Sequence, residues 1–338
     1  MSIHRRIVLA SRPTGFPTVD NFRLEEAPVP TPGEGEVLVR NHFLSLDPYM
    51  RGRMSTGKSY AEPQPLDQVM IGGTAGEVVA SRHKHYAVGD RVTAMGGWQE
   101  YSLIGGSSLA MLQKVDTRQI PLSAYLGPVG MPGITAWYGL SQIIAPKPRE
   151  TVIVSAAAGA VGSVVGQLAK ARGCRVIGIA GGAEKCAYVV EELGFDACID
   201  YKGAADVRAL DARLAEVAPN GIDGCFENVG GMGLDAVLGR MNPFGRIAVC
   251  GMIAGYNGEP IPITNATAIL RMRLKVQGFI VFEQPDTVGW AVAELSAMLA
   301  SGRLRYRETI AEGLDSAPAA FLGLLQGRNV GKQLVRLV

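Results

Sequence analysis

The pattern of hydrophobic and polar positions changes character about halfway along the chain. Up to about Asp116, short strand-like runs alternate with turn residues, as at 36–40, 76–80 and 90–94. Sequences rich in glycine and proline, such as Thr31-Pro-Gly-Glu-Gly35, separate these runs. The first third of the chain is therefore predicted to be a β-rich module.

From about Thr151, apolar strand-like segments alternate with amphipathic helical ones. Strands are expected at 151–155, 175–180, 197–200, 224–227 and 245–250, and helices at 161–172, 184–193, 207–217 and 234–241. This alternation predicts βαβ units and a parallel sheet with helices on both faces. The tail from about residue 301 is expected to return to short β-like pieces that close onto the first module.

The first of these strands runs into a glycine-containing turn, Ala157-Ala-Gly159-Ala-Val-Gly162. This is the dinucleotide-binding fingerprint with alanine at its first glycine position, and it stands between a strand and a helix, as the motif requires. Gly159 would let the backbone approach a pyrophosphate, and Gly162 would let helix and strand pack closely. A turn with only a structural role is the alternative.

The end of the second strand distinguishes the two pyridine dinucleotides. An NAD site places a carboxylate there to hold the ribose 2′-hydroxyl. Here the strand ends Ile179-Ala-Gly181-Gly, the first carboxylate is Glu184, and Lys185 follows it. Without the acid a 2′-phosphate is not repelled, and the lysine can donate a charge-assisted hydrogen bond. The sequence favours NADPH.

The chain offers few ligands for a catalytic zinc. No cysteine precedes Cys174, and the histidines are His4, His42, His83 and His85, without a ligand partner at useful spacing. Oxidation of simple alcohols is therefore not expected. Hydride addition to the β-carbon of an enone needs only hydrogen-bond donors for the carbonyl oxygen, a dry pocket and a proton source.

Tyr256 is the first candidate for such a donor, because it follows the loop at the end of the strand 245–250. Ligands of open α/β sheets bind at the carboxyl ends of the strands. Taken alone, any tyrosine of this chain is more often structural.

Composition excludes several other classes of function. Hydrophobic residues make up 47% of the 338, charged residues 19%, and the net charge is +2, so no nucleic-acid partner is expected. The long uncharged stretch 119–146 is interrupted by Pro128 and Pro132, and no membrane span is expected. Five cysteines without a C-x-x-C pair, and a start without an apolar leader, predict a cytoplasmic protein with reduced thiols.

Several motifs together resemble the zinc-free branch of the medium-chain dehydrogenase/reductase superfamily, in its group of prostaglandin, leukotriene and bacterial curcumin reductases. They are Leu46-Asp-Pro-Tyr-Met-Arg51, Gly130-Met-Pro-Gly-Ile-Thr-Ala136, Ala156-Ala-Ala-Gly-Ala-Val-Gly162, Phe226-Glu-Asn-Val-Gly230 and Gly327-Arg-Asn-Val-Gly-Lys332. The resemblance implies an α/β fold, with a Rossmann-type doubly wound parallel sheet and a β-rich GroES-like catalytic domain. The expected domains are 1–125 (catalytic), 126–300 (NADPH-binding) and 301–338 (the return to the catalytic domain).

The resemblance also implies site residues, position by position. The implied NADPH contacts are Gly159, Ala160, Val161, Gly162, Gly181, Lys185, Tyr201, Asn228, Cys250, Gly251, Tyr256, Phe279, Ile280, Val281 and Asn329. The implied catalytic tyrosines are Tyr256, Tyr60 and Tyr49, and the substrate pocket is bordered by Met131 and Thr135. No metal site is implied.

The family resemblance further implies a homodimer formed through sheet edges near 279–282. The expected reaction is NADPH-dependent reduction of the C=C bond of small α,β-unsaturated aldehydes and ketones. Two alternatives stay open: a zinc-free NADPH quinone oxidoreductase, and a non-catalytic NADPH-binding protein.

Overall fold

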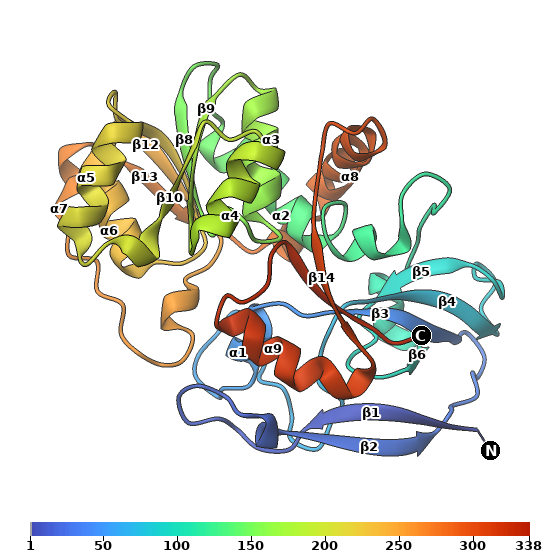
Figure 1. Cartoon of the computed structure of the whole chain (residues 1–338). Helices are drawn as coiled ribbons and strands as arrows, with labels where there is room; N and C mark the ends of the chain where they lie inside the picture. Colours follow the sequence, from blue (N-terminus) through green and yellow to red (C-terminus); the bar gives the residue numbers. More distant parts are fainter. Residues whose placement is uncertain (1) are drawn as a thin grey trace. The chain divides into compact units, whose positions relative to one another are not determined.

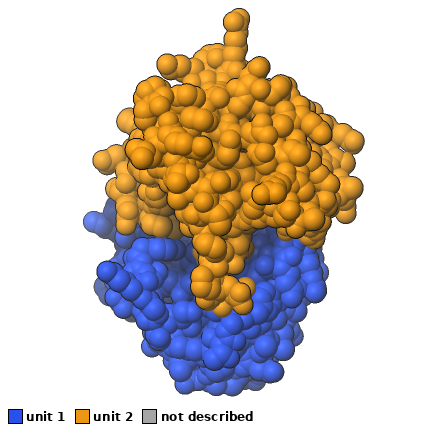
Figure 2. Space-filling view, turned by 90° about the vertical axis from the view of Figure 1, so that its left-hand side faces the viewer, with its two compact units in different colours: residues 1–126, 308–338 blue, residues 127–307 orange. Residues whose placement is uncertain are grey.

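The computed structural model describes residues 2–338 and divides into two compact units, which Figure 2 shows in different colours. Unit 1 holds the chain up to Leu126 together with Glu308–Val338, and unit 2 is Gly127–Arg307. The sequence placed these divisions after residues 125 and 300. Unit 1 is therefore built from two separate stretches of chain, whereas unit 2 is continuous.

Unit 1 is a β-rich module whose strands come from both ends of the chain (Figure 1). Its elements are β1 (Ile3–Leu9), β2 (Phe22–Pro28), β3 (Val37–Ser45), α1 (Tyr49–Arg53), β4 (Thr74–Ser81), β5 (Arg91–Ala94), β6 (Tyr101–Ile104), β7 (Gln113–Lys114), β14 (Glu308–Glu312), α9 (Ala317–Leu325) and β15 (Lys332–Arg336). The main sheet has the order β14-β15-β3-β4-β5-β7, with β6 also pairing β3, and β1 pairs β2 separately. The last strand, β15, lies antiparallel to β3.

The tail differs from its expected form, because 317–325 is a helix and not a short β-like piece. Helix α9 has a proline in its first turn and is otherwise rich in alanine and leucine, which are strong helix formers. It buries Phe321, whose ring lies 5.8 Å from that of Trp98, and Trp98 stacks on Phe22 at 5.1 Å. The tail thus contributes to the aromatic core of unit 1.

Unit 2 contains a six-stranded sheet in which every neighbouring pair is parallel. Its elements are α2 (Met131–Tyr138), β8 (Thr151–Ser155), α3 (Gly162–Ala171), β9 (Arg175–Ala180), α4 (Ala183–Ala187), β10 (Ala197–Asp200), α5 (Val207–Val217), β11 (Ile222–Glu227), α6 (Gly231–Arg240), β12 (Met241–Val249), α7 (Thr267–Arg271), β13 (Lys275–Gly278) and α8 (Pro285–Ala300). The strand order β10-β9-β8-β11-β12-β13 is that of a doubly wound Rossmann-type sheet.

Burial explains why the strands of unit 2 read as unbroken apolar runs. All five residues of β8 are buried, and α3 directs Val164, Val165 and Leu168 inward. Helix α2 packs against α3 and α8, while α5 packs against α6. The helix expected at 184–193 changes to a wider π-turn at Tyr188. Within residues 2–338, no helix combines the length and apolarity needed to cross a bilayer.

Candidate active site

The centre of the sheet in unit 2 contains a topological switch point. From β8 the chain crosses to β9 and β10, then returns to the other side of β8 to form β11. Helices that leave adjacent strands in opposite directions open a crevice at the carboxyl ends of those strands. A ligand site is therefore expected at the segments that follow β8, β11 and β12.

The turn after β8 is tightly packed at Gly159 and has no room for a side chain at Gly162. Ala156 adopts a positive φ of 48°, and its carbonyl oxygen accepts a 2.9 Å hydrogen bond from the Gly159 N–H. A Cβ added to Gly162 would lie 2.4 Å from that oxygen, and one added to Gly159 would lie 3.1 Å from it. The absent side chain at 162 lets α3 start directly against the end of β8.

The N-terminus of α3 is suited to an anion. No side chain caps this ten-residue helix, whose N-cap residue is Val161. The first N–H groups of a helix point along its axis and carry the positive end of the helix dipole. The segment Gly159–Gly162 thus has both the close backbone approach and the donors that a pyrophosphate requires.

Positive side chains gather where β9 and β10 end. A Cβ on Gly181 would lie 2.9 Å from the Tyr201 ring and 3.0 Å from Cε of Lys202, so all three residues are close together. Lys185 is half-buried, and burial followed by the positive charge of Lys202 lowers its pKa. Two lysines and a tyrosine hydroxyl thus surround the end of β9, where an NAD site would carry a carboxylate.

A nearby carboxylate, that of Asp200, is engaged by the backbone. Its Oδ1 accepts hydrogen bonds from the N–H groups of Gly182 (2.8 Å) and Lys202 (3.0 Å). Arg213 holds the same turn by donating to the carbonyl oxygens of Asp200 and Gly203. Asp200 therefore shapes the turn that carries Tyr201 and Lys202.

Asn228 is fixed at the switch point by Ser155 on the neighbouring strand. Its Nδ2 donates to the Ser155 carbonyl oxygen and its backbone N–H donates to Ser155 Oγ, both at 2.7 Å. Ser155 Oγ in turn donates to the carboxylate of the buried Glu227 at 2.7 Å. The carboxyl ends of β8 and β11 are thereby joined through side chains.

The loop after β12 returns to the same place. The N–H groups of Cys250 and Gly251 donate to the Glu227 carbonyl oxygen, at 2.9 and 3.2 Å. A Cβ on Gly251 would lie 3.1 Å from the hydroxyl oxygen of Tyr256, so this half-buried tyrosine turns back over the loop. Burial, and then the Glu227 carboxylate, raises the pKa of Cys250 to about 12, which keeps this thiol protonated.

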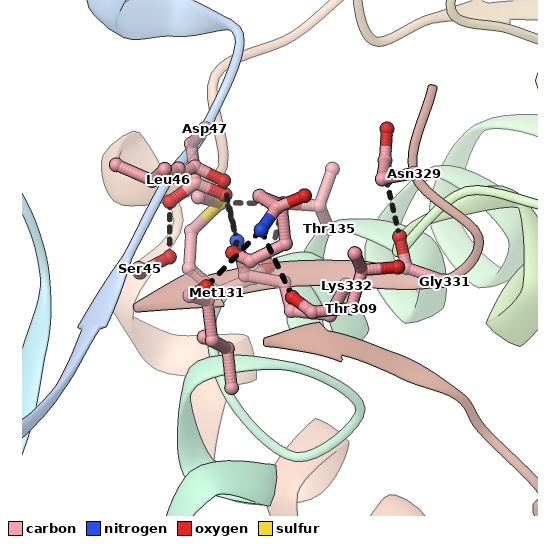
Figure 3. A network of polar contacts seen from close by, with 11 residues as sticks. Ser45, Leu46, Asp47, Met131, Thr135, Thr309, Asn329, Gly331 and Lys332 are labelled. Atoms are coloured by element: carbon pink, nitrogen blue, oxygen red, sulfur yellow. Dashed lines mark hydrogen bonds and ion pairs between the residues drawn. The ribbon is translucent and has the colours of Figure 1, made fainter. Parts of the chain in front are cut away.

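Two other predicted positions in unit 2, Phe279 and Thr135, have their side chains engaged locally. The Phe279 ring packs on Tyr138 (5.4 Å) and Phe226 (6.2 Å), so the segment 279–281 that follows β13 is anchored inward. In α2, Thr135 Oγ1 donates to the Met131 carbonyl oxygen at 2.7 Å (Figure 3). The Thr135 hydroxyl is thus used within its own helix.

The remaining predicted residues, Tyr49, Tyr60 and Asn329, belong to unit 1. Tyr49 begins α1, and burial, then the charges of Asp47 and Tyr60, raise its pKa well above the usual range. Tyr60 is 58% exposed. Asn329 donates from Nδ2 to the Gly331 carbonyl oxygen at 2.8 Å, which closes the turn before β15 (Figure 3).

A buried ion pair joins the two stretches of unit 1. Lys332 Nζ lies 3.0 Å from Asp47 Oδ1 and also donates to the carbonyl oxygens of Leu46 (2.6 Å) and Gln333 (3.1 Å) (Figure 3). Both charged side chains are less than a tenth exposed. Ser45 donates to the other Asp47 oxygen. The network fixes the Asp-Pro-Tyr segment to the last strand.

Sequence reasoning missed three residues that this structure places beside predicted ones: Lys202, Ser155 and Glu227. Lys202 directly follows the predicted residue Tyr201, so it could have been predicted as a second cation near Lys185. Ser155 and Glu227 are the last residues of β8 and β11. They could have been predicted because each is a polar residue at the end of an apolar strand of a parallel sheet. Among residues 2–338, no group of three or more His, Cys, Asp or Glu side chains is arranged to hold a metal ion.

Two protein-family models match the chain. Residues 5–112 match the N-terminal domain of oxidoreductase, and residues 160–297 match a model described as zinc-binding dehydrogenase. The first match lies in unit 1 and the second in unit 2.

Curated relatives match nearly end to end. The NADPH-dependent curcumin reductase of Escherichia coli (strain K12) is 47% identical, over 99% of this chain and 97% of the relative. Prostaglandin reductase 1 of Rattus norvegicus is 42% identical over 95% of each. The NADP(+)-dependent 2-alkenal reductase of Nicotiana tabacum is 40% identical, over 98% of this chain and 97% of the relative.

Among solved structures, CurA from Vibrio vulnificus in complex with NADPH has a TM-score of 0.92 and 48% identity, covering 99% of both chains. An Escherichia coli quinone oxidoreductase complexed with NADPH has a TM-score of 0.78 at 22% identity, which shows the shared fold alone. The chain therefore belongs to the zinc-free group of the medium-chain dehydrogenase/reductase superfamily that includes the curcumin, prostaglandin and 2-alkenal reductases.

Proposed function

We propose that this protein is an NADPH-dependent reductase of the C=C bond in small α,β-unsaturated aldehydes and ketones. The observation that carries the proposal is the end of β9, where Tyr201 and Lys202 lie against Gly181 and Lys185 is close enough to Lys202 for the two charges to interact. Its full-length relatives are named for NADPH-dependent reduction of curcumin, for prostaglandin reduction and for NADP-dependent reduction of 2-alkenals.

The described residues fit the cofactor along the switch point of unit 2. The turn at Gly159–Gly162 would receive the pyrophosphate on the N-terminus of α3. The 2′-phosphate would accept hydrogen bonds from Lys185, Lys202 and Tyr201. The nicotinamide half would take its contacts from Asn228, the loop Cys250–Tyr256 and the segment 279–281.

The chain's own contribution to the reaction is hydrogen bonding to the substrate oxygen. When bound, NADPH supplies the hydride that adds to the β-carbon of the enone. Negative charge then develops on the carbonyl oxygen, and Tyr256 of unit 2 stabilises it by donating a hydrogen bond. Tyr49 and Tyr60, the other two tyrosines that the sequence predicts to be catalytic, belong to unit 1, and their role stays a prediction. The raised pKa of Tyr49 keeps its hydroxyl protonated at any physiological pH.

The reaction needs no Lewis acid, because the charge on the substrate oxygen is met by hydrogen bonds. We therefore propose a zinc-independent enzyme. The first unit lacks cysteine altogether, and its four histidines are far apart in the sequence except for His83 and His85. Dialysis against a strong chelator should leave the activity unchanged, and loss of activity restored by Zn²⁺ alone would contradict the proposal.

A substrate panel tests the activity. Purified protein is offered 2-hexenal, 3-octen-2-one, a curcuminoid and 1,4-naphthoquinone with NADPH or NADH, and products are identified by mass spectrometry. We expect saturated aldehydes and ketones, formed with NADPH in preference to NADH. Allylic alcohols would show reduction of the wrong bond. A kcat/KM about a hundredfold higher for the quinone would replace the proposal by a quinone reductase, and NADPH binding without turnover would indicate a binding protein.

We also propose that the protein forms a homodimer through the edge of the sheet in unit 2. Strand β13 pairs only with β12 in the described chain, which leaves its other edge open. Exposed apolar side chains lie on this strand and shortly after it: Val276 (44%) and Phe282 (55%). Joining two such edges covers this surface and extends the sheet.

Light scattering after gel filtration tests the assembly. The wild type should elute with twice the chain mass of 35.8 kDa. Val276→Lys places a charge on the proposed interface and should give monomers. Ile3→Lys, which replaces a more exposed apolar residue (62%) in β1 of unit 1, serves as the control and should remain dimeric. Monomeric wild type, or a dimeric Val276→Lys variant, would contradict the proposed interface.

A further inference from the structure

Glu227 is a buried carboxylate at the switch point for which the proposed reaction has no direct use. It is the last residue of β11 and is 1% exposed. Its Oε1 accepts three hydrogen bonds: from Ser155 Oγ (2.7 Å), the Val229 N–H (2.6 Å) and the Gly230 N–H (2.8 Å). Placing a carboxylate in the interior costs free energy unless such donors compensate it, so this arrangement is specific.

The carboxylate holds a turn against its neighbouring strand. The donors at Val229 and Gly230 lie directly before α6, so the negative charge also faces the positive end of that helix dipole. The third donor, Ser155, ends β8 and in addition accepts the Asn228 N–H. One oxygen atom thus fixes the turn 228–230 relative to the end of β8.

The loop that carries Tyr256 rests on the same turn. The N–H groups of Cys250 and Gly251 donate to the Glu227 carbonyl oxygen. Further along the loop, the Ile253 N–H donates to the Asn228 carbonyl oxygen (3.2 Å) and the Ala254 N–H donates to that of Val229 (3.0 Å). The position of the loop 250–256 therefore depends on the backbone of 227–229.

We propose that Glu227 is a positioning residue: its side-chain hydrogen bonds hold the turn 228–230 and, through it, the loop 250–256, in the arrangement that receives the nicotinamide half of the cofactor. The inference rests on the proposed function for the identity of that cofactor. Glu227 does not act at the 2′-phosphate end, because Lys185, Tyr201 and Lys202 follow β9 and β10 instead.

Two ligands separate this role from a general structural one. NADPH contains both halves of the dinucleotide, whereas adenosine 2′,5′-bisphosphate contains the 2′-phosphate but no nicotinamide. Their dissociation constants are measured by calorimetry for the wild type, Glu227→Gln, Glu227→Ala and Ser155→Ala. In Glu227→Gln, the side-chain oxygen can take the place of Oε1 and accept the same three hydrogen bonds. The NH₂ group then takes the place of Oε2, where the Cys225 thiol lies 3.9 Å away.

We expect Glu227→Ala and Ser155→Ala to weaken NADPH binding by about tenfold and to leave the bisphosphate unchanged. Glu227→Gln should bind both ligands within about twofold of the wild type. In turnover, the two alanine variants should lower kcat and raise the deuterium isotope effect with 4-deuterated NADPH, because a misplaced donor carbon slows the hydride step. Should Glu227→Ala fail to fold, Ser155→Ala makes the same comparison.

If the alanine variants bound NADPH and the bisphosphate equally weakly, Glu227 would have only a general structural role, and the proposal would be overturned. Unchanged NADPH binding in the folded alanine variants would overturn it too, and so would a Glu227→Gln variant that behaves like alanine, because charge and not hydrogen-bond geometry would then matter. A wild type that binds NADPH but reduces no enone would refute the proposed function instead. The binding comparison remains decisive in that case.

Discussion

At the scale of single residues, Lys202 offers the sharpest test of the cofactor preference. It lies against Gly181, and burial followed by the charge of Lys202 lowers the pKa of Lys185, so both lysines face one small region. Lys202→Ala removes one charge-assisted donor to the 2′-phosphate and should weaken NADPH binding by roughly tenfold, with NADH binding unaffected. Lys147→Ala, an exposed lysine before β8, is the matched control. If Lys202→Ala weakened the binding of NADPH and NADH equally, Lys202 would not be a ligand of the 2′-phosphate.

Tyr256 is the residue on which the proposed chemistry depends. Its hydroxyl lies over Gly251 at the carboxyl end of β12. Tyr256→Phe removes a donor to the developing negative charge, and loss of one such donor can cost about a hundredfold in kcat, less where another donor compensates. NADPH affinity should change little. Steady-state kinetics with 3-octen-2-one decide the matter, and an unaltered kcat would rule out this role.

At the scale of elements, the contact of β8 with α3 is tightest at Gly162. An alanine there would place its Cβ 2.4 Å from the Ala156 carbonyl oxygen. Gly162→Ala should therefore force the helix away from the strand, at a cost of about 1–3 kcal/mol in unfolding free energy, and weaken NADPH binding.

Gly233→Ala, in the first turn of α6, is the corresponding control. No atom outside its own stretch of helix lies within 4 Å of its added Cβ, so alanine should be neutral or stabilising by up to roughly 1 kcal/mol. Urea unfolding and an NADPH titration of both variants test the difference. Equal stability of the two would show that the turn adjusts without cost.

Some helices and strands could be predicted from the sequence alone, and others could not. The periodicity of apolar residues placed β9, β10 and α5 at their observed bounds, because a buried strand and an amphipathic helix each impose their own spacing. It missed α9, whose residues are apolar nearly all round and so show no helical stripe. Strands β1 and β2 lie in the predicted β-rich module but were not located individually, because charged residues such as Arg5, Arg6 and Glu25 interrupt their apolar runs.

The site was predictable only where the chemistry is local. The turn Gly159–Gly162 and the absence of an acid after β9 can be read directly from consecutive residues. The triple acceptor role of Glu227 cannot, because it depends on Ser155, which lies 72 residues away. The roles of the predicted residues stay predictions until the variants are measured.

At the scale of the whole molecule, one buried and one half-buried histidine link stability to pH. His4 and His42 both belong to unit 1, and burial lowers the pKa of each below the usual 6.5. The unfolded chain therefore binds protons first as the pH falls. The two neutral histidines make their full contribution to the free energy of unfolding above pH 6.5. This contribution is lost as the pH falls from 6.5 through the lowered pKa values of the folded state.

Melting temperatures between pH 8 and pH 5 measure this effect. We expect the wild type to lose stability below pH 6.5, and the double variant His4→Gln, His42→Gln to lose less over the same interval. A double variant whose melting temperature falls as steeply as that of the wild type would assign the acid sensitivity to other groups.

The ion pair between Lys332 and Asp47 has a consequence for how the protein is made. The cation follows its partner by 285 residues, and the whole of unit 2 is synthesised between the two. Unit 2 is continuous and can acquire its sheet while translation proceeds. The stretch Phe43–Ser45 of β3, in contrast, stays without its β15 partner until that strand has left the ribosome. The module that begins first along the chain is thus the one that can be completed last.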